Sequence, residues 1–183
     1  AIGYAEASDT PFELGIIRNH YVGRTFIEPT QTIRAFSVKL KHNANRILVD
    51  KKRVILIDDS IVRGTTSIKI VQMMREAGAT EVHMRIAAPP IRHPDFYGID
   101  TPVQDQLLAA NSSLAEMCDF IGADSLAFLT VDGLYKAMGH KNGRDNDNPA
   151  YTDHCFTGDY PTQLQDQKND EKIQQLSLLS ERR

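Results

Sequence analysis

The sequence has little cysteine, no long apolar run and no excess of positive charge, and each shortage excludes a class of protein. Its 183 residues include two cysteines, Cys118 and Cys155, which form neither a CxxC pair nor a disulfide framework, so we expect a reducing, cytoplasmic location. No apolar run approaches the roughly 20 residues that a membrane-spanning helix needs, which predicts no membrane partner. The formal net charge of -3 also predicts no nucleic-acid partner.

The composition that remains is that of an ordinary globular domain. Hydrophobic residues make up 41% and charged residues 25% of the chain, which favours one core with or without a tail. No internal repeat is present at the periods of 20–50 residues that are typical of repeat arrays. The first residue is Ala1 rather than an initiating Met, so we expect the chain to be a piece of a longer protein.

The middle of the chain predicts a strand, a helix and a second strand. "RVILID" (53–58) is a continuous apolar run of the kind that parallel sheets bury on both faces. Residues 65–79 follow with an apolar helical period, a predicted cap at Thr65 or Thr66, and Gly78 as the stop. "EVHMRIAAPP" (81–90) is the next strand. This order is a βαβ unit, which predicts the α/β fold class.

Further elements extend this sheet to about Met138. We expect a helix end at 1–8, strands at 13–19 and 125–129, and helices around 103–110, 113–122 and 131–138. Residues 1–138 are therefore predicted to form one domain, with a mainly parallel sheet flanked by helices. Residues 139–160 form a polar linker and C-terminal extension in this prediction, and 161–183 a mobile tail.

A long basic stretch interrupts the early part of the domain. Residues 21–46 mix Arg, Lys, Thr and Gln without a sustained period of 2 or 3.6, which predicts a long loop with a short helix near its end. Loops beyond about 12–15 residues in a compact domain are usually functional or disordered. We expect a flexible lid over a binding site, and a merely solvated segment is the alternative.

Two carboxylates stand where the first strand of the βαβ unit ends. In "VILIDDSIVRGTTS" (54–67), Asp58 and Asp59 are followed by a turn of small hydroxyl residues and then by the helix. Ligands of open parallel sheets bind outside the carboxyl ends of the strands, where helix N-termini present free N–H groups. The turn therefore predicts an anion site, with Gly64 giving close backbone approach and Arg63 adding charge. Its hydroxyl donors are Ser60, Thr65, Thr66 and Ser67.

The acidic pair must serve a different part of the same ligand. The turn is neither a Walker A loop nor a GxGxxG fingerprint. Carboxylates repel phosphate, but they accept hydrogen bonds from sugar hydroxyls and attract Mg²⁺. A ribose that carries a 5'-phosphate satisfies both halves of the site.

Four blocks, in this order along the chain, resemble one family. They are "IRNHYVGRTFI", "SVKLKHNANR", "VILIDDSIVRGTTS" and "PPIRHPDFYGID". Together they look like the phosphoribosyltransferase domain of the amidophosphoribosyltransferases, also called glutamine phosphoribosylpyrophosphate amidotransferases. The resemblance covers roughly residues 1–138 and returns at "CFTGDYPT" (155–162). It implies the type I phosphoribosyltransferase fold and a C-terminal fragment that lacks the glutaminase domain with its nucleophilic cysteine.

The resemblance also implies a reaction. Ammonia derived from glutamine attacks C1 of phosphoribosylpyrophosphate, pyrophosphate leaves, and 5-phosphoribosylamine forms as the first step of purine nucleotide (IMP) synthesis. By similarity, Asp58 and Asp59 bind the ribose hydroxyls and the Mg²⁺ complex, and residues 60–67 bind the 5'-phosphate. Arg18, Tyr21 and Arg24 match the diphosphate end, with Arg24 on the lid. Purine nucleotides are the expected feedback inhibitors, and the full-length form is an expected homo-oligomer.

The same comparison bears on iron. Some members of this family carry a [4Fe–4S] cluster, whose ligand positions match Asp95, Thr152 and Cys155 here. A single thiolate cannot hold a cluster that needs about four ligands, so no cluster is expected. No histidine lies at a metal-ligand spacing from a Cys or another His, and we interpret all six as structural or surface residues.

Three other interpretations stay open at this point. The acidic pair could merely cap the following helix, although one carboxylate suffices for a cap. A regulatory module could bind phosphoribosylpyrophosphate without turnover. A phosphoacceptor receiver domain also places paired acids after a strand, but it needs a further acceptor Asp and a Lys, and "DDSIVRGTT" fits it poorly.

Overall fold

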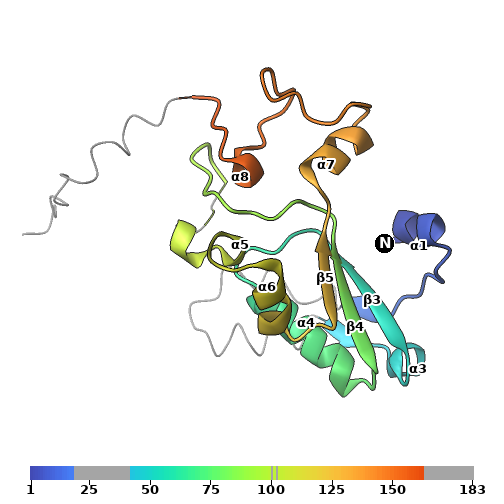
Figure 1. Cartoon of the computed structure of the whole chain (residues 1–183). Coiled ribbons are helices and arrows are strands. Elements are labelled where there is room, and N and C mark those ends of the chain that lie inside the picture. Colours follow the sequence, from blue (N-terminus) through green and yellow to red (C-terminus); the bar gives the residue numbers. More distant parts are fainter. Residues whose placement is uncertain (19–41, 100, 102, 163–183) are drawn as a thin grey trace, which may run out of the picture.

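The computed structural model describes residues 1–18, 42–99, 101 and 103–162 (Figure 1). Its centre is a three-stranded sheet in the order β3-β4-β5, with both pairs parallel. The strands are β3 (Arg53–Asp58), β4 (Glu81–Ile86) and β5 (Ser125–Phe128). This confirms the α/β class and the two strands of the predicted βαβ unit.

The register brings the carboxyl ends of all three strands to one edge. Asp58 pairs with Ile86, and Ile86 pairs with Phe128. Parallel strands that run side by side end at the same edge, so the loops after β3, β4 and β5 leave the sheet together. Chemistry at the end of β3 can therefore use groups from the loop after β4 beside it.

Two helices cover one face of this sheet and form the core with it. They are α4 (Thr65–Glu76) and α6 (Leu114–Ile121), which lie side by side in Figure 1. Their buried residues Val71, Met74, Met117 and Ile121 pack in one cluster with Val82, Met84 and Leu126 of the strands. The apolar period of residues 65–79 predicts this buried side of α4, and Gly78 has φ 102° just beyond the helix.

The remaining elements are short. Among the described residues they are α1 (Ile2–Ser8), β1 (Ile16–Arg18), β2 (His42–Ala44), α3 (Arg46–Val49), η2 (Gln104–Gln106), α5 (Leu108–Asn111), α7 (Val131–Ala137) and α8 (His154–Thr157). The helix predicted around 103–110 is a 3₁₀ turn followed by one α-helical turn. β1 and β2, which flank residues 19–41, pair antiparallel. Most of the predicted lid falls within residues 19–41 and therefore lies outside the described residues.

A buried ion pair fastens the segment that follows α7. The Arg144 guanidinium donates to Asp153 from Nε (2.7 Å) and from Nη2 (3.2 Å), and their side chains are 8% and 4% exposed. Tyr135 of α7 donates to the same carboxylate at 2.8 Å. Burial alone would raise the pKa of Asp153, but hydrogen bonds from Arg144, Tyr135 and Thr157 outweigh it and lower the pKa. Residues 139–160 thus have buried contacts that their polar composition does not predict.

We expect Asp153→Asn to lower the free energy of unfolding by about 3 kcal/mol, because it leaves the buried Arg144 guanidinium with only the exposed Asp159 carboxylate as an ion-pair partner. The matched control is Asp159→Asn: Asp159 accepts from the same guanidinium at 2.6 Å, but its side chain is 51% exposed. Urea denaturation followed by circular dichroism measures both variants. Equal losses of stability in the two variants would contradict the assignment.

The same pair predicts a pH dependence. Because the folded-state pKa of Asp153 is lowered, its contribution is complete above the unfolded pKa of about 3.9 and is lost as the pH falls through the folded pKa. The stability gap between wild type and Asp153→Asn should therefore be constant near neutral pH and shrink below about pH 4.

Candidate functional site

The acidic pair lies at the carboxyl edge of the sheet, as the sequence predicts. Asp58 is the last residue of β3 and is half-buried, whereas Asp59 is exposed. The backbone N–H of Asp59 donates to Asp58 Oδ1 at 3.0 Å, and Ser60 Oγ donates to Asp59 Oδ1 at 3.1 Å. The N-cap of α4 is Gly64, so neither acid occupies the cap position. The local hydrogen bonds orient two carboxylates at one strand end.

The helix that follows begins at glycine. Gly64 is the N-cap of α4, with φ 74°, and no side chain forms a cap hydrogen bond there, so the predicted cap at Thr65 or Thr66 is wrong. A Cβ at position 64 would lie 2.8 Å from Leu108 Cδ2 and 3.1 Å from Phe120 Cε1. Both the backbone conformation and the packing therefore require glycine. Without a capping side chain, the N-terminal N–H groups of α4 face no competing oxygen from their own cap.

The predicted hydroxyl donors are not equivalent. Thr65 and Thr66 are exposed at the start of α4, and Ser60 is half-buried beside Asp59. Ser67 is only 3% exposed and lies on the buried side of the helix. The structure therefore gives no support to its hydroxyl as a ligand donor. Its backbone N–H still belongs to the first turn of α4, where a helix has no internal acceptor.

Arg63 is held by a residue that the sequence pattern does not reveal. Its Nε and Nη2 both donate to Gln106 Oε1, at 3.1 and 2.8 Å. The backbone joins the same two regions, because the Leu108 N–H donates to the Val62 carbonyl at 2.9 Å. The turn after β3 is thus attached to η2 and α5. Gln106 is 43 residues away from Arg63, so no local spacing could have indicated the contact.

Three predicted site residues lie at or beyond the limit of the described structure. Arg18 is the last residue of β1. Tyr21 and Arg24 fall within residues 19–41 and lie outside the described residues, as does most of the predicted lid.

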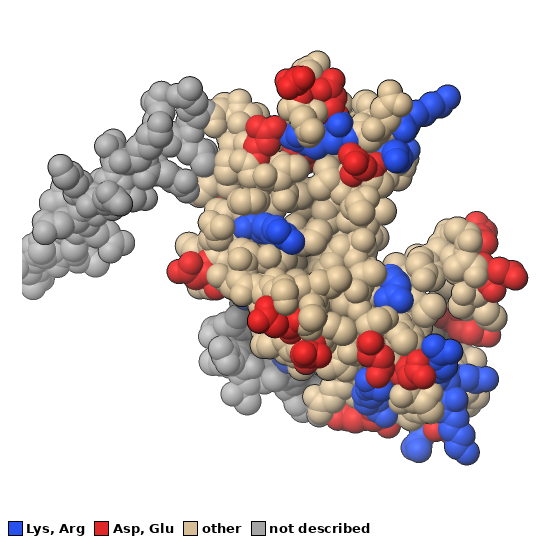
Figure 2. Space-filling model, viewed as in Figure 1, with Lys and Arg blue, Asp and Glu red and all other residues tan. Residues whose placement is uncertain are grey.

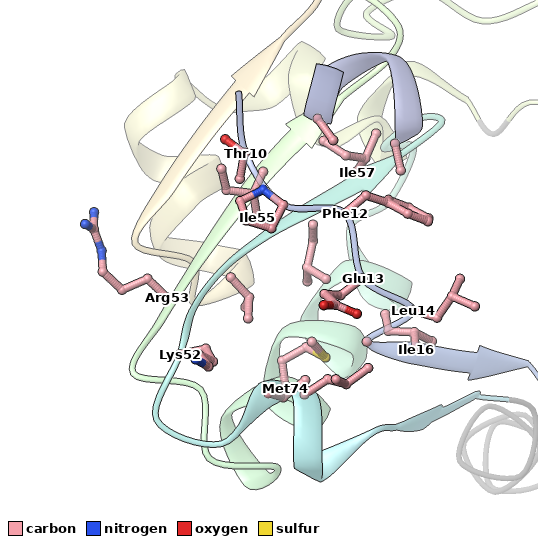
Figure 3. A pocket seen from close by; sticks show the side chains of 18 of the residues that line it. Thr10, Phe12, Glu13, Leu14, Ile16, Lys52, Arg53, Ile55, Ile57 and Met74 are labelled. Atoms are coloured by element: carbon pink, nitrogen blue, oxygen red, sulfur yellow. The ribbon is translucent and has the colours of Figure 1, made fainter. Parts of the chain in front are cut away.

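A separate cavity lies away from the acidic pair and the turn that follows it. This cavity of about 910 Å³ opens between the N-terminal segment and β3, and none of the predicted site residues that the structure describes lines it. Figure 3 shows the N-terminal segment with Phe12, Glu13 and Leu14 on one side and β3 with Ile55 and Ile57 on the other. Lys52 and Arg53 lie toward the start of β3. Its lining combines apolar side chains with the polar residues Thr10, Glu13, Lys52, Arg53 and His83.

Charge is mixed over the face shown in Figure 2. Basic and acidic groups gather together around α3 and the start of β3, and again over the segment that follows α7. This view has no broad basic patch, in agreement with the net charge of -3. No helix among the residues that the structure describes is long and apolar enough to span a membrane.

Asp95, His154 and Cys155 come together in a second group, between the loop after β4 and α8. One potential ligand atom from each lies within 4.8 Å of the others. His154 is interpreted from the sequence as structural or surface, and no local spacing relates it to Asp95, which lies 59 residues away. Cys155 is the one thiol in this group, and the nearby position of Thr152 offers no second one. These residues do not fit a [4Fe–4S] cluster, which needs about four ligands that are mostly thiolates.

Comparison with known proteins gives consistent relatives, although no family model matches the sequence. The chain is 63% identical over 181 residues to the amidophosphoribosyltransferase of Rhizobium etli, covering 98% of this chain and 36% of the relative. It is 56% identical over 164 residues to the amidophosphoribosyltransferase of Bacillus subtilis, and this match covers 90% of this chain and 34% of the relative.

A solved structure agrees with these relatives. Glutamine phosphoribosylpyrophosphate amidotransferase from B. subtilis, complexed with ADP and GMP, superposes with a TM-score of 0.76 at 55% identity. The match covers 90% of this chain and 36% of that one. The chain therefore belongs to the amidophosphoribosyltransferase family, and it spans about a third of the length of the relatives that it matches.

Proposed function

We propose that this chain carries the phosphoribosylpyrophosphate site of an amidophosphoribosyltransferase. The observation that supports this most is the order of groups after β3: two carboxylates, a turn, and the glycine-capped N-terminus of α4. A ligand bound there contacts the carboxylate acceptors at one end and the backbone N–H donors of α4 at the other. The relatives named above carry the activity in their names, and the chain shares about half or more of its residues with them.

The two halves of the site suit the two ends of a ribose 5-phosphate. Asp58 and Asp59 accept hydrogen bonds from the ribose 2' and 3' hydroxyls, since ionised carboxylates are acceptors only. The 5'-phosphate binds at the first turn of α4, where backbone N–H groups and the helix dipole favour an anion. The exposed hydroxyls of Thr65 and Thr66 add donors. Arg63, held by Gln106, adds positive charge at the edge of this site.

The reaction needs alignment more than proton transfer. Ammonia forms a bond from nitrogen to C1, and the bond from C1 to the pyrophosphate oxygen breaks with its electron pair leaving on pyrophosphate. The nitrogen then loses a proton to solvent. Fixing the ribose at its hydroxyls and its phosphate presents C1 to the ammonia in one orientation, which lowers the entropic part of the barrier. The carboxylates also lie near the ring on which positive charge develops.

Mg²⁺ fits the donors that the site offers. Carboxylate oxygens are its preferred protein ligands, and Asp58 and Asp59 present two carboxylates at one strand end, of which Asp59 is exposed. These two residues would hold the ion together with the substrate. When bound, Mg²⁺ neutralises charge on the departing pyrophosphate. Arg18, Tyr21 and Arg24 complete the diphosphate end in this proposal, with Arg24 on the lid.

Regulation and assembly follow from the same assignment. The B. subtilis relative is described as complexed with ADP and GMP. We extend this to purine nucleotides as feedback inhibitors here, to glutamine as the source of ammonia, and to a homo-oligomeric full-length enzyme in the cytoplasm. Both cysteines are free thiols, which suits a reducing compartment.

Substitution of the acidic pair tests the ribose contact. Asp58→Asn and Asp59→Asn in the full-length enzyme should each lower kcat/KM for phosphoribosylpyrophosphate at least tenfold, about 1.4 kcal/mol of transition-state stabilisation. An amide keeps the shape but loses the charge and half of the acceptors. Pyrophosphate release measures the rate, and calorimetry with phosphoribosylpyrophosphate and Mg²⁺ measures binding. Wild-type rates in both variants would refute the role, and binding without any pyrophosphate release in the wild type would favour the regulatory module.

Gln106 tests whether the turn must be held. Gln106→Ala removes both hydrogen bonds to Arg63, and we expect KM for phosphoribosylpyrophosphate to rise about fivefold, near the 1 kcal/mol of a typical hydrogen bond. The matched control is Gln104→Ala, an exposed glutamine on the same 3₁₀ turn, for which we expect a change below twofold. Steady-state kinetics at saturating ammonia separate KM from kcat. A rise in KM that both variants share would point to the turn as a whole rather than to Arg63.

The nitrogen source tests what this chain can do by itself. Burial is the largest cause that raises the pKa of both cysteines, with Asp119 adding to it at Cys118 and Asp95 at Cys155. Neither is the activated thiolate that glutamine hydrolysis needs. We expect no pyrophosphate release above background when the 183-residue chain is given phosphoribosylpyrophosphate, Mg²⁺ and glutamine, and slow release with ammonia at alkaline pH. Glutamine-supported turnover, in a preparation whose mass excludes other chains, would contradict this.

A further inference from the structure

Three different ligand types converge where α8 meets the loop after β4. Nε2 of His154 lies 2.8 Å from Asp95 Oδ2 and 3.5 Å from Cys155 Sγ. All three donor atoms fall within 4.8 Å of one another. Among the residues that the structure describes, no other group of three such side chains is as close.

The surrounding backbone holds these donors in place. Asp95 Oδ1 accepts from the N–H groups of Tyr97 (2.9 Å) and Ile99 (2.8 Å), which leaves Oδ2 turned to the histidine. The carbonyl of Cys155 accepts from the N–H groups of Arg92 and His93, at 2.9 and 3.1 Å. Main-chain hydrogen bonds thus join the loop after β4 to α8. Because these side chains are already positioned, binding an ion costs little additional conformational entropy.

The group is buried beneath aromatic rings. The side chains of His154 and Asp95 are 3% and 2% exposed, and Cys155 is half-buried. The ring of Tyr97 meets the imidazole edge-on at 5.1 Å between centroids, and that of Tyr160 lies at 4.9 Å. Such a site excludes most of the water that would compete for a bound ion, while the half-exposed thiol leaves a path for entry.

The imidazole is satisfied on one side only. His154 Nδ1 is a buried nitrogen without a hydrogen-bond partner, and it is the one such side-chain atom among the described residues. Both polar neighbours of the ring approach Nε2. This excludes a Cys–His nucleophile, in which the thiol and the orienting acid bind opposite nitrogens of the ring. Instead, the potential ligand atoms of the three side chains converge on one point, as the ligands of a metal ion do.

We propose that Asp95, His154 and Cys155 bind a single divalent zinc ion. Zinc accepts oxygen, nitrogen and sulfur ligands in one tetrahedral site, whereas Mg²⁺ and Ca²⁺ require oxygen ligands. The three side chains leave the fourth position to water. The ion replaces the proton between His154 and Asp95 and balances the carboxylate and the thiolate, two charges that are costly to bury alone.

Two of the three distances between ligand atoms fit with a small adjustment, and the third, between Asp95 and Cys155, is within 4.8 Å. Zinc bonds of about 2.0–2.3 Å place tetrahedral ligand atoms roughly 3.4–3.6 Å apart. The 3.5 Å between Cys155 Sγ and His154 Nε2 already has this value. The 2.8 Å between Nε2 and Asp95 Oδ2 is a hydrogen-bond length and must widen by roughly 0.6 Å when the ion replaces the proton. Zinc would then fasten the segment after α7 to the loop that follows β4.

Metal content and a spectroscopic probe test this in the purified full-length protein. After exchange against Zn²⁺ and gel filtration, elemental analysis should give one zinc per chain, without stoichiometric iron or sulfide. Substitution by Co²⁺ should give a thiolate-to-cobalt charge-transfer band and the visible bands of tetrahedral cobalt. Neither readout depends on transferase activity, so failure here and failure of the proposed function are separate outcomes.

Matched cysteine variants locate the ion. Cys155→Ser should abolish the charge-transfer band and weaken Zn²⁺ affinity at least 100-fold, and Asp95→Asn should weaken it at least tenfold. Cys118→Ser is the control: this half-buried thiol donates to the Ala123 carbonyl at 3.2 Å, outside the group, and its loss should change affinity less than twofold.

Several results would overturn the proposal. They are zinc below 0.1 per chain after exchange, a charge-transfer band that persists in Cys155→Ser, and four irons with sulfide. If Cys155→Ser does not fold, alkylation of the wild type decides: Zn²⁺ should slow modification of Cys155 by iodoacetamide at least tenfold and leave Cys118 unchanged. Equal rates at Cys155 with and without Zn²⁺ would exclude the site.

Discussion

The parallel pairing of β3 with β4 is the constraint on which the rest of the structure depends. Because Asp58 pairs with Ile86, each strand ends beside the other and the chain leaves the sheet in two adjacent loops. One loop carries the acidic pair into α4, and the other leads to Asp95. A one-residue slip in this register would turn Leu56 away from the helices and expose it, which the buried core opposes. Hydrophobic packing on one face of the sheet thus decides where the carboxylates lie.

The sequence predicts the elements that carry a strong local pattern. The apolar run of β3 and the helical period of α4 both come from burial, and both appear at the expected places. α4 begins at the predicted residue but its cap differs, because threonines are good caps and Gly64 gives no local sign of packing against Leu108 and Phe120. The stretch at 103–110 was too short for periodicity to separate a 3₁₀ turn from an α-helix.

The contacts that the sequence does not predict join residues that are far apart in the chain. Asp95 and His154 are separated by 59 residues, and Arg63 and Gln106 by 43. Each of these residues is ordinary in its own surroundings, so no spacing rule applies to it. The polar stretch 139–160 illustrates the same limit: composition suggests a solvated segment, whereas Asp153 is buried through three hydrogen-bond donors from other positions. Only the fold shows that these polar groups satisfy one another.

Gly64 connects the packing of α5 and α6 to the edge of the sheet at which the strands end. The space that a side chain would occupy is taken by Leu108 of α5 and Phe120 of α6, so two packed helices set the point at which α4 begins. The geometry of the turn after β3, where we propose that the 5'-phosphate binds, is therefore set by two side chains that are not part of the proposed site. During evolution, positions 108 and 120 would be restricted in size by substrate binding, although each looks like an ordinary packing residue.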